Sequence, residues 1–597
     1  MAIVGFDFGT TNSLVSIIQG GRAISFLDDE DLPVPSVVCY EGGRTIVGRG
    51  AKERLAEAGL GIHGNIIKSP KTLLGQESVF VEGINRSPVD IVSEVIRYVS
   101  QQVSASPRGR KLGNVTHAVV TIPVGMVGHQ RVALRDAFRK AGISIVQFIH
   151  EPHAALYAFF RSSGNYDSLV RQYDRKLLLV FDWGGGTLDL TLCQLINGML
   201  VQVVNDGTND VGGDAFDEIL KNEIVQRELL SRGIQDQVQV HPDANARMLH
   251  RCERSKIDLS TRNKVEIYIS NYFQGIQQEE LAYTLHREEM EEIVSPLLDK
   301  GLVRINKLLE SANVSSSQID LCLATGGMAN MPAIKARLHE WFGPQRVHVP
   351  DEKSGTMIAE GAAWVAADQA KLHLAKNVEL VLARDSFLPL IKSGSEMPVE
   401  GEVRRDQFHL YCTDPRDGTA KFQIQAPVRH GAKVLPSDRR IPLENITIEV
   451  DCLAKPFRER LELDVEIDDN LILKAKARAL NIQSYSEVEV HNLEFGLSLP
   501  DATKAFLLSE EDTCRSNVGT EEHLESGLSV RSNVTNTEDK RLVPGELLAS
   551  YDSSYFDTRN NPPEIQVEEN LYYAPCAVCG RSSNDPLCCS FVKPEFK

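Results

Sequence analysis

Two short acidic turns rich in glycine constrain this sequence more than any other feature. They read Asp7-Phe-Gly-Thr-Thr-Asn12 and Asp182-Trp-Gly-Gly-Gly-Thr187, and each follows an apolar run that predicts a β-strand. β-type alternation follows each turn, so each predicts a hairpin tip. Glycines there let backbone amides approach an anion, hydroxyls add donors, and a carboxylate can hold a hydrated metal. One such turn is usually an ordinary hairpin, but the matched pair predicts a divided nucleotide site.

Length and composition predict a soluble protein of several domains. The chain has 597 residues, 42% of them hydrophobic and 24% charged, which is ordinary for folds with sizeable cores. No stretch reaches the length of a membrane span and no signal peptide is evident, so we expect a cytoplasmic protein without a membrane partner. The formal net charge of -18 argues against direct nucleic-acid binding.

The pattern of apolar residues changes along the chain and predicts five segments. Residues 1–372 alternate strand-like and helical periods, as in an α/β fold, and residues 386–500 show the short alternating strands of an antiparallel β-sandwich. Residues 373–385 are expected to link these two domains, although the run Val378-Glu-Leu-Val-Leu-Ala-Arg-Asp385 within them could equally form the first strand of the sandwich. A polar and acidic stretch at 501–570 predicts disorder, and 571–597 form a cysteine-rich end.

The first domain resembles the DnaK-type seventy-kilodalton heat-shock chaperones, within the superfamily of actin-like and hexokinase-like ATPases. Besides the two turns, the ordered matches are Pro35-Ser-Val37, Lys71-Thr-Leu-Leu-Gly75, Val119-Val-Thr-Ile-Pro123, Glu151-Pro152, Gly212-Gly-Asp214 and Gly326-Gly327. The resemblance implies an actin-like domain of two lobes, a duplicated ribonuclease H-like fold. It also implies ATP or ADP with Mg²⁺ in the cleft, and water as the group that attacks ATP.

Five residues carry the reaction by this resemblance: Asp7, Lys71, Glu151, Asp182 and Thr187. The two aspartates would orient hydrated Mg²⁺, and Glu151 would touch its water shell. Lys71 would reach the γ-phosphate and the attacking water, with Lys68 as a nearby competitor for that role. Such catalysis is mostly positioning and charge neutralisation, so losing one donor should cost on the order of 10² in rate.

The remaining nucleotide contacts are also implied by the resemblance. They are Gly9, Thr10, Thr11, Asn12, Gly184, Gly185 and Gly186 at the phosphates, and Gly212, Gly213, Gly326 and Gly327 facing the nucleoside. Glu253, Lys256 and Ser260 would share one helix face and grip the ribose and base, although a solvated Glu-Lys pair explains the same spacing. Asn330 stands where the family usually has an arginine that stacks on adenine, and an amide cannot supply that stack.

The resemblance extends more weakly beyond the first domain. Pro123 and Arg131 resemble a switch pair that relays the nucleotide state towards the linker. The second domain resembles a diverged substrate-binding sandwich, in which an extended peptide adds to the sheet edge, but no helical lid follows it. The implied partners are an unfolded or dedicated client polypeptide, a J-domain co-chaperone and a nucleotide-exchange factor.

Four cysteines near the end of the chain suggest a metal site. Cys576, Cys579, Cys588 and Cys589 could hold Zn²⁺, because thiolates on a tight turn can share one tetrahedral ion. A redox-active thiol cluster and unpaired cysteines in a disordered tail are the alternatives.

Together these features predict a divergent chaperone that couples Mg-ATP hydrolysis to polypeptide binding by the sandwich. The main alternative is a nucleotide-dependent switch or scaffold for one dedicated protein partner, which the missing lid favours. A third reading is an actin-like filament former, which would sediment cooperatively with ATP. A small-molecule kinase is disfavoured because no sugar or acid site is evident.

Overall fold

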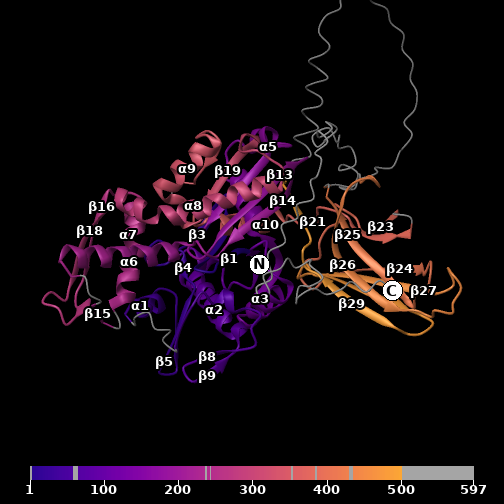
Figure 1. The fold of residues 1–597 in the computed structure, drawn as a ribbon, viewed down its shortest axis with the longest axis horizontal. Helices are drawn as coiled ribbons and strands as arrows, with labels where there is room; N and C mark the ends of the chain where they lie inside the picture. Colours follow the sequence, from indigo (N-terminus) through magenta and orange to yellow (C-terminus); the bar gives the residue numbers. More distant parts are fainter. Residues whose placement is uncertain are drawn as a thin grey trace, which may run out of the picture. The chain divides into compact units, whose positions relative to one another are not determined.

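The computed structural model describes residues 3–500, apart from short gaps at 58–64, 235–237, 242–243, 351–353, 384–385, 429 and 431–433. The predicted disordered stretch at 501–570 and the four cysteines from Cys576 to Cys589 lie outside these residues. The described residues form an α/β part and an all-β part, which Figure 1 colours from indigo to magenta and from orange to yellow. All of them belong to one compact unit.

The first lobe is built on a sheet with the strand order β11-β10-β1-β2-β3, to which β4 adds beside β2. The strands are β1 (Val4–Phe8), β2 (Asn12–Gln19), β3 (Arg22–Phe26), β4 (Val34–Pro35), β10 (His117–Ile122) and β11 (Ser144–His150). Strands β1 to β3 form an antiparallel meander, and β10 and β11 continue the sheet in parallel. The central strands are almost wholly buried, as expected for parallel strands covered on both faces.

The second lobe repeats this plan. Its sheet has the order β20-β19-β12-β13-β14-β30-β21. The strands are β12 (Leu177–Trp183), β13 (Leu188–Ile196), β14 (Met199–Thr208), β19 (Ile319–Thr325), β20 (Val347–His348), β21 (Leu372–Leu374) and β30 (Phe495–Ser498). Strands β12 to β14 form the meander, and β19 runs parallel to β12 as β10 does to β1. The two predicted turns therefore occupy equivalent places in two similar sheets.

Helices and smaller strands complete the two lobes. The helices are α1 (Arg49–Glu57), α2 (Pro88–Ala105), α3 (Gly128–Lys140), α4 (Glu151–Arg161), α5 (Tyr166–Tyr173), α6 (Gly213–Ser231), α7 (Ala244–Leu259), α8 (Arg287–Ser311), α9 (Pro332–Phe342) and α10 (Met357–Asp368). The short 3-10 helices are η1 (Pro70–Leu73), η2 (Gly109–Lys111), η3 (Ser316–Gln318) and η4 (Gly327–Asn330). The smaller strands are β5 (Val37–Glu41), β6 (Arg44–Val47), β7 (Ile66–Lys68), β8 (Val79–Val81), β9 (Ile84–Arg86), β15 (Gln239–Val240), β16 (Lys264–Ile269), β17 (Phe273–Gln274) and β18 (Leu281–His286).

Helix α10 packs unusually closely against α4 and β1. A Cβ atom added to Gly361 would lie 1.8 Å from the backbone oxygen of Ala154, and one added to Gly5 would lie 2.2 Å from the backbone nitrogen of Ala363. Because backbone atoms on both sides make these contacts, only glycine fits at either position. This packing fixes the strand that leads into the first acidic turn.

The all-β part is a sandwich of two four-stranded antiparallel sheets, ordered β23-β22-β25-β26 and β24-β27-β28-β29. The strands are β22 (Val378–Leu382), β23 (Ser386–Ile391), β24 (Val403–Tyr411), β25 (Thr419–Pro427), β26 (Arg440–Glu449), β27 (Arg460–Asp468), β28 (Leu473–Ala479) and β29 (Tyr485–Val490). Inward residues of β27 such as Leu463 and Ile467 are fully buried, and their neighbours are more exposed. The predicted antiparallel β-sandwich is confirmed.

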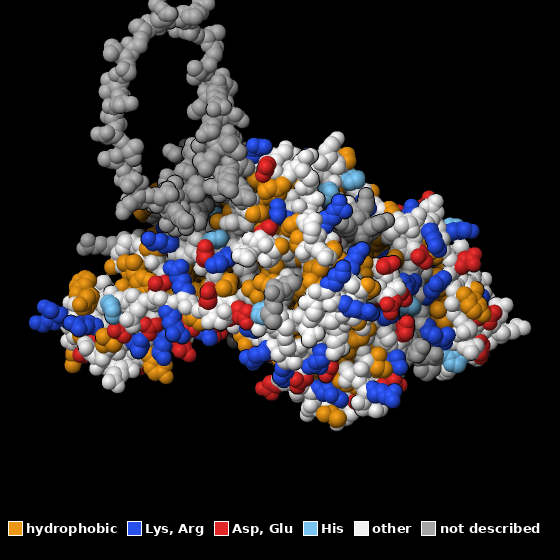
Figure 2. All heavy atoms as spheres, turned by 180° about the vertical axis from the view of Figure 1, so that it is seen from behind, with side chains coloured by type: hydrophobic (Ala, Val, Ile, Leu, Met, Phe, Trp, Pro, Cys, Tyr) orange, Lys and Arg blue, Asp and Glu red, His pale blue; other side chains and the backbone are white. Residues whose placement is uncertain are grey.

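The described surface mixes charges of both signs. In Figure 2, Lys and Arg side chains lie interspersed with Asp and Glu over the face shown, with small apolar patches between them. None of the described helices is long and apolar enough to cross a membrane.

Candidate functional site

The two predicted phosphate loops meet between the lobes. A Cβ atom on Gly185 would lie 2.9 Å from Thr11 Oγ1, and one on Gly186 would lie 3.4 Å from Thr10 Cγ2. Among the residues that the structure describes, none forms a hydrogen bond with the buried Thr11 Oγ1, as expected of a donor that meets a ligand. Loops from two separate hairpins therefore form one cradle of glycine and threonine.

The two later glycine pairs join the same cradle. The backbone amides of Gly213 and Asp214 donate to the carbonyl oxygens of Gly184 and Gly185 at 3.1 and 2.8 Å. Gly326 has a φ of 82°, and a Cβ atom there would lie 2.6 Å from Asp182 Oδ1. The structure thus brings the predicted glycine positions of the second lobe together around the second acidic turn.

Four carboxylates lie beneath the cradle, from Asp7, Glu151, Asp182 and Asp189. Asp7 accepts a hydrogen bond from Thr121 Oγ1 at 2.7 Å, and Asp189 accepts one from Thr187 Oγ1 at 2.8 Å. Lys71, in η1, donates to Glu151 Oε1 at 3.1 Å, and only 6% of its side chain is exposed. All five predicted catalytic residues are therefore gathered here, and Asp189 lies beside them.

The charge balance of this cluster favours a cation. Burial and the neighbouring Glu151 raise the pKa of Asp7 and of Asp189 to about 6. Burial, followed by Glu151, Asp189 and Asp7, holds the pKa of Asp182 well above its usual range. Several ionised carboxylates that are buried away from solvent repel one another unless a cation neutralises their charge. Oxygen ligands of this kind suit hydrated Mg²⁺, so the residues present fit that ion.

A cavity of about 150 Å³ adjoins the cluster. Its lining includes Pro123, Glu151, Asp182, Asp189 and Gly207. The predicted switch residue Pro123 thus lies at the wall of the cavity that holds the carboxylates.

The predicted nucleoside contacts are engaged with protein groups. Lys256 Nζ donates to the Gly213 carbonyl oxygen at 2.7 Å and pairs with Asp217 at 2.8 Å. Burial raises the pKa of Asp217 to about 7, although Lys256 acts in the opposite direction. Ser260 Oγ donates to the Lys256 carbonyl oxygen at 3.2 Å. Glu253 and Lys256 lie in α7 and Ser260 follows its last residue, and the contact of these three residues with a nucleoside stays a prediction.

Asn330 lies at the same end of the cleft. Its Nδ2 donates to Ser354 Oγ at 2.7 Å, and Ser354 is buried. The side chain that replaces the family arginine is therefore held by a neighbouring hydroxyl.

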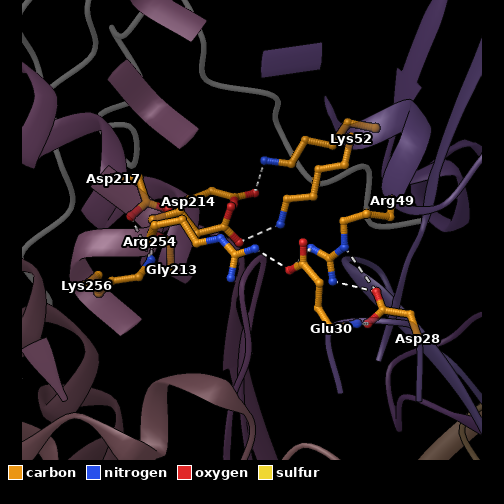
Figure 3. Close-up of polar contacts among 11 residues, drawn as sticks. Asp28, Glu30, Arg49, Lys52, Gly213, Asp214, Asp217, Arg254 and Lys256 are labelled. Carbon is orange, nitrogen blue, oxygen red and sulfur yellow. Dashed lines mark hydrogen bonds and ion pairs between the residues drawn. The ribbon is translucent and has the colours of Figure 1, made fainter. Parts of the chain in front are cut away.

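Ion pairs join side chains of the first lobe to side chains of the second lobe, and Figure 3 shows them. Lys52 of α1 pairs with Glu253 of α7 at 2.7 Å, and Lys68 of β7 pairs with Asp214 of α6 at 2.6 Å. Arg254 pairs with Glu30, which also lies 3.6 Å from Arg49. We call the Lys52, Lys68 and Arg254 pairs the cleft latch. Lys68 is thus engaged away from the catalytic cluster, which leaves Lys71 in the predicted role.

Sequence reasoning missed most of the cleft latch. The paired residues are separated by 201, 146 and 224 positions along the chain. Lone charged residues at such separations carry no periodic signal, so nothing in the sequence pointed to their pairing.

Arg131, the other predicted switch residue, contacts the sandwich. Its guanidinium donates to the carbonyl oxygens of Leu471 and His491 at 3.2 and 3.0 Å and is only 2% exposed. Burial lowers the pKa of Arg131 to about 10. Pro123 and Arg131 therefore touch the catalytic cavity and the sandwich respectively.

Within the described ranges, no group of three or more His, Cys, Asp or Glu side chains is arranged to hold a metal ion directly. The proposed zinc ligands from Cys576 to Cys589 fall outside those ranges.

Comparison with known proteins gives a consistent result. Residues 3–385 match the family model described as Hsp70 protein. A protein named Chaperone protein DnaK from Mycoplasma mycoides subsp. mycoides is 28% identical over 500 residues, which cover 82% of this chain and 80% of the relative. A protein of the same name from Mycoplasmoides gallisepticum is 26% identical over 506 residues, with the same two shares covered.

Proposed function

The chain belongs to the Hsp70 family of ATP-dependent chaperones and is an ATPase, and from this we propose that it couples Mg-ATP hydrolysis between its two glycine loops to polypeptide binding by its β-sandwich. The observation that carries the catalytic part is the cluster of Asp7, Glu151, Asp182 and Asp189 beneath the loops, with Lys71 beside it.

Each residue of the cluster has a defined task in this proposal. Asp7 and Asp182 hold the hydrated metal, and Glu151 fixes the Lys71 ammonium where the γ-phosphate would end. Asp189 accepts the Thr187 hydroxyl hydrogen, which turns the oxygen lone pairs of Thr187 towards the loops. When bound, Mg²⁺ supplies charge neutralisation at the phosphate oxygens. The backbone amides of both loops bind the phosphates, and burial excludes bulk water from the reaction.

The nucleoside is assigned to the space beside α7 and η4. Glu253 already pairs with Lys52, and Lys256 already pairs with Asp217. A ribose hydroxyl that binds Glu253 would therefore compete with Lys52 for a carboxylate that is already paired. Asn330 offers an amide at the base instead of a cation. We therefore expect weaker discrimination among nucleobases than a stacked arginine would give.

The client polypeptide is assigned to the end of the sandwich where the loops after β24, β26 and β28 meet. Backbone hydrogen bonds join these loops, from Phe457 to Cys412 and from Leu480 to Arg460. Leu453 is 88% exposed and Phe457 is 63% exposed, which is unusual for large apolar side chains. A dedicated protein partner on the same loops is the alternative, which makes the chain a switch or scaffold.

The test measures Mg²⁺-dependent ATP turnover with and without an unfolded peptide. Lys71→Ala and Thr187→Ala should each lose about 10² in rate, whereas the matched control Lys68→Ala should retain turnover. The double variant Leu453→Ser with Phe457→Ser should keep basal turnover and lose the response to peptide. No turnover in the wild type would refute the catalytic assignment, and turnover that ignores every peptide would favour the dedicated partner.

The remaining assignments, which come from the family resemblance or from the sequence pattern, stay predictions. They are a J-domain co-chaperone, a nucleotide-exchange factor, a cytoplasmic location, the domain limits 1–372, 373–385 and 386–500, and Zn²⁺ or redox chemistry at the terminal cysteines.

A further inference from the structure

Two short strands outside the sandwich hold both of its ends. β21 (Leu372–Leu374) precedes the first sandwich strand, and β30 (Phe495–Ser498) follows the last one. Both belong to the sheet of the second lobe, where β30 lies between β14 and β21. The sandwich is therefore connected to the ATPase part by two segments of chain, each of which ends in a strand of the same sheet.

β30 is paired on both edges. Leu497 lies opposite Leu200 of β14 on one side and opposite Leu372 of β21 on the other. The pairing extends beyond both ends of the strand. The Leu499 amide donates to the Gly198 carbonyl oxygen at 2.8 Å, and the Ala375 amide donates to the Glu494 carbonyl oxygen at 2.9 Å. A strand that is paired on two edges cannot leave a sheet without breaking both ladders.

The side chains of this strand are packed as core residues. Phe495 and Leu497 are fully buried and Leu499 is 4% exposed. A Cβ atom on Gly496 would lie only 2.7 Å from Met199 Sδ, so the glycine permits the close approach to β14. Release of β30 together with Leu499, which follows it, would expose three buried apolar side chains at once, together with the edge of β14.

The first lobe holds the same sandwich through α3. Arg135 donates to Asn470 Oδ1 at 2.8 Å and to the Asp469 carbonyl oxygen at 2.7 Å, next to the contacts already described for Arg131. Gly128, at the start of α3, lies so close that a Cβ atom there would be 2.3 Å from His491 Nδ1. Hydrogen bonds from Arg131 and Arg135 to backbone carbonyl oxygens thus add directional contacts to the apolar packing of β30.

We propose that the sandwich is an inserted domain that stays attached to the ATPase part in every nucleotide state, with β30 as the permanent fastening. Strand β14 then connects the two functions directly. Its first residues pair with β30, and Gly207 near its other end pairs with Asp189 in the catalytic cluster. A change of bound nucleotide is transmitted to the sandwich by a movement of the sheet that contains β14 and β30, and the sandwich does not detach. This inference depends on the ATPase activity and not on the proposed peptide site.

Amide hydrogen exchange of the full chain, followed by mass spectrometry, tests this inference. Exchange is measured without nucleotide, with Mg-ADP, and with Mg-ATP in Thr187→Ala to slow hydrolysis. Peptides that cover β30 and the start of β14 should exchange at the same slow rate, within about twofold, in all three conditions. Faster exchange of β30 by about tenfold or more in any one nucleotide state would overturn the proposal.

Two variants provide the internal controls. Leu497→Asp places a charge in the buried strand and should accelerate exchange in β30 and in the facing part of β14. Leu453→Asp, at an exposed loop, should leave both unchanged. If Leu497→Asp fails to fold, Leu497→Ala tests the same strand with a smaller perturbation, because it places no charge there. Normal protection of β30 in Leu497→Asp would show that the strand is not the fastening. Because the readout is exchange and not turnover, it separates this inference from failure of the proposed peptide site.

Discussion

Removing one charge from the cleft latch should speed nucleotide release. We choose Lys52→Met, because Lys52 pairs with Glu253 across the cleft and is not among the predicted nucleotide contacts. A nucleotide held between two lobes leaves when the lobes separate, and separation must break the latch pairs. The substitution keeps the length and apolar stem of the side chain and removes only its charge.

The expected change in the rate of ADP release follows from how exposed the paired side chains are. The side chains of Lys52 and Glu253 are 18% and 27% exposed, and their charges lie 2.7 Å apart. A partly buried pair of this kind contributes about 1 kcal/mol, which corresponds to a roughly fivefold faster release. Lys68 and Asp214 are 43% and 42% exposed, so Lys68→Met should change release by about twofold or less. High ionic strength screens these charges, so it should reduce the difference in release rate between each of the two variants and the wild type.

The assay is stopped-flow displacement of a fluorescent ADP analogue by excess ATP, at low and at high ionic strength. Lys140→Met is the matched control, because Lys140 pairs with Asp90 at 2.6 Å within one lobe. If Lys52→Met and Lys140→Met release ADP equally fast, the latch does not resist opening and the reasoning is refuted.

Two further predictions concern protons and packing. Because Asp7 and Asp189 have pKa values raised to about 6, both hold protons below that pH, and a metal-bound nucleotide must displace them. Calorimetry in buffers of different ionisation enthalpy should therefore find more proton release on Mg-ADP binding at pH 6 than at pH 7, with affinity rising with pH across that range; no release at pH 6 would contradict the shifts. Gly361→Ala should lower the unfolding free energy by about 1–3 kcal/mol or more, because the new Cβ meets the Ala154 backbone, whereas Gly164→Ala enters open space and should leave thermal unfolding unchanged.

Local patterns were enough to predict where the two acidic turns lie and which strands lead into them. Each acidic turn is specified by its own glycines and by the apolar strand before it, so Asp7 and Asp182 could be placed from short windows of sequence. The alternation in β27 and β28 likewise specifies a sandwich strand by strand. Lys71 and Glu151 were assigned by resemblance, and the structure brings the two together.

Pairings between distant segments could not be read in the same way. β30 is four residues long and follows the sandwich directly, so its sequence alone favours the sandwich rather than a sheet whose other strands lie far earlier in the chain. Lys256 was expected to face a nucleoside, and its bond to Asp217 depends on how α6 packs against α7. Register and helix packing are set by tertiary contacts, which leave little trace in local periodicity.

The latch and the fastened sandwich constrain each other. The sandwich holds the first lobe through Arg131 and Arg135 and the second lobe through β30, so one body spans both lobes on its side of the ATPase part. We expect lobes joined there to separate by rotating about that junction, and a rotation that separates α1 from α7 would break the Lys52–Glu253 pair. A ligand that stiffens the sandwich would then resist the same rotation that releases nucleotide. Slower ADP release with bound peptide, and its loss in Leu497→Asp, would follow from that geometry alone.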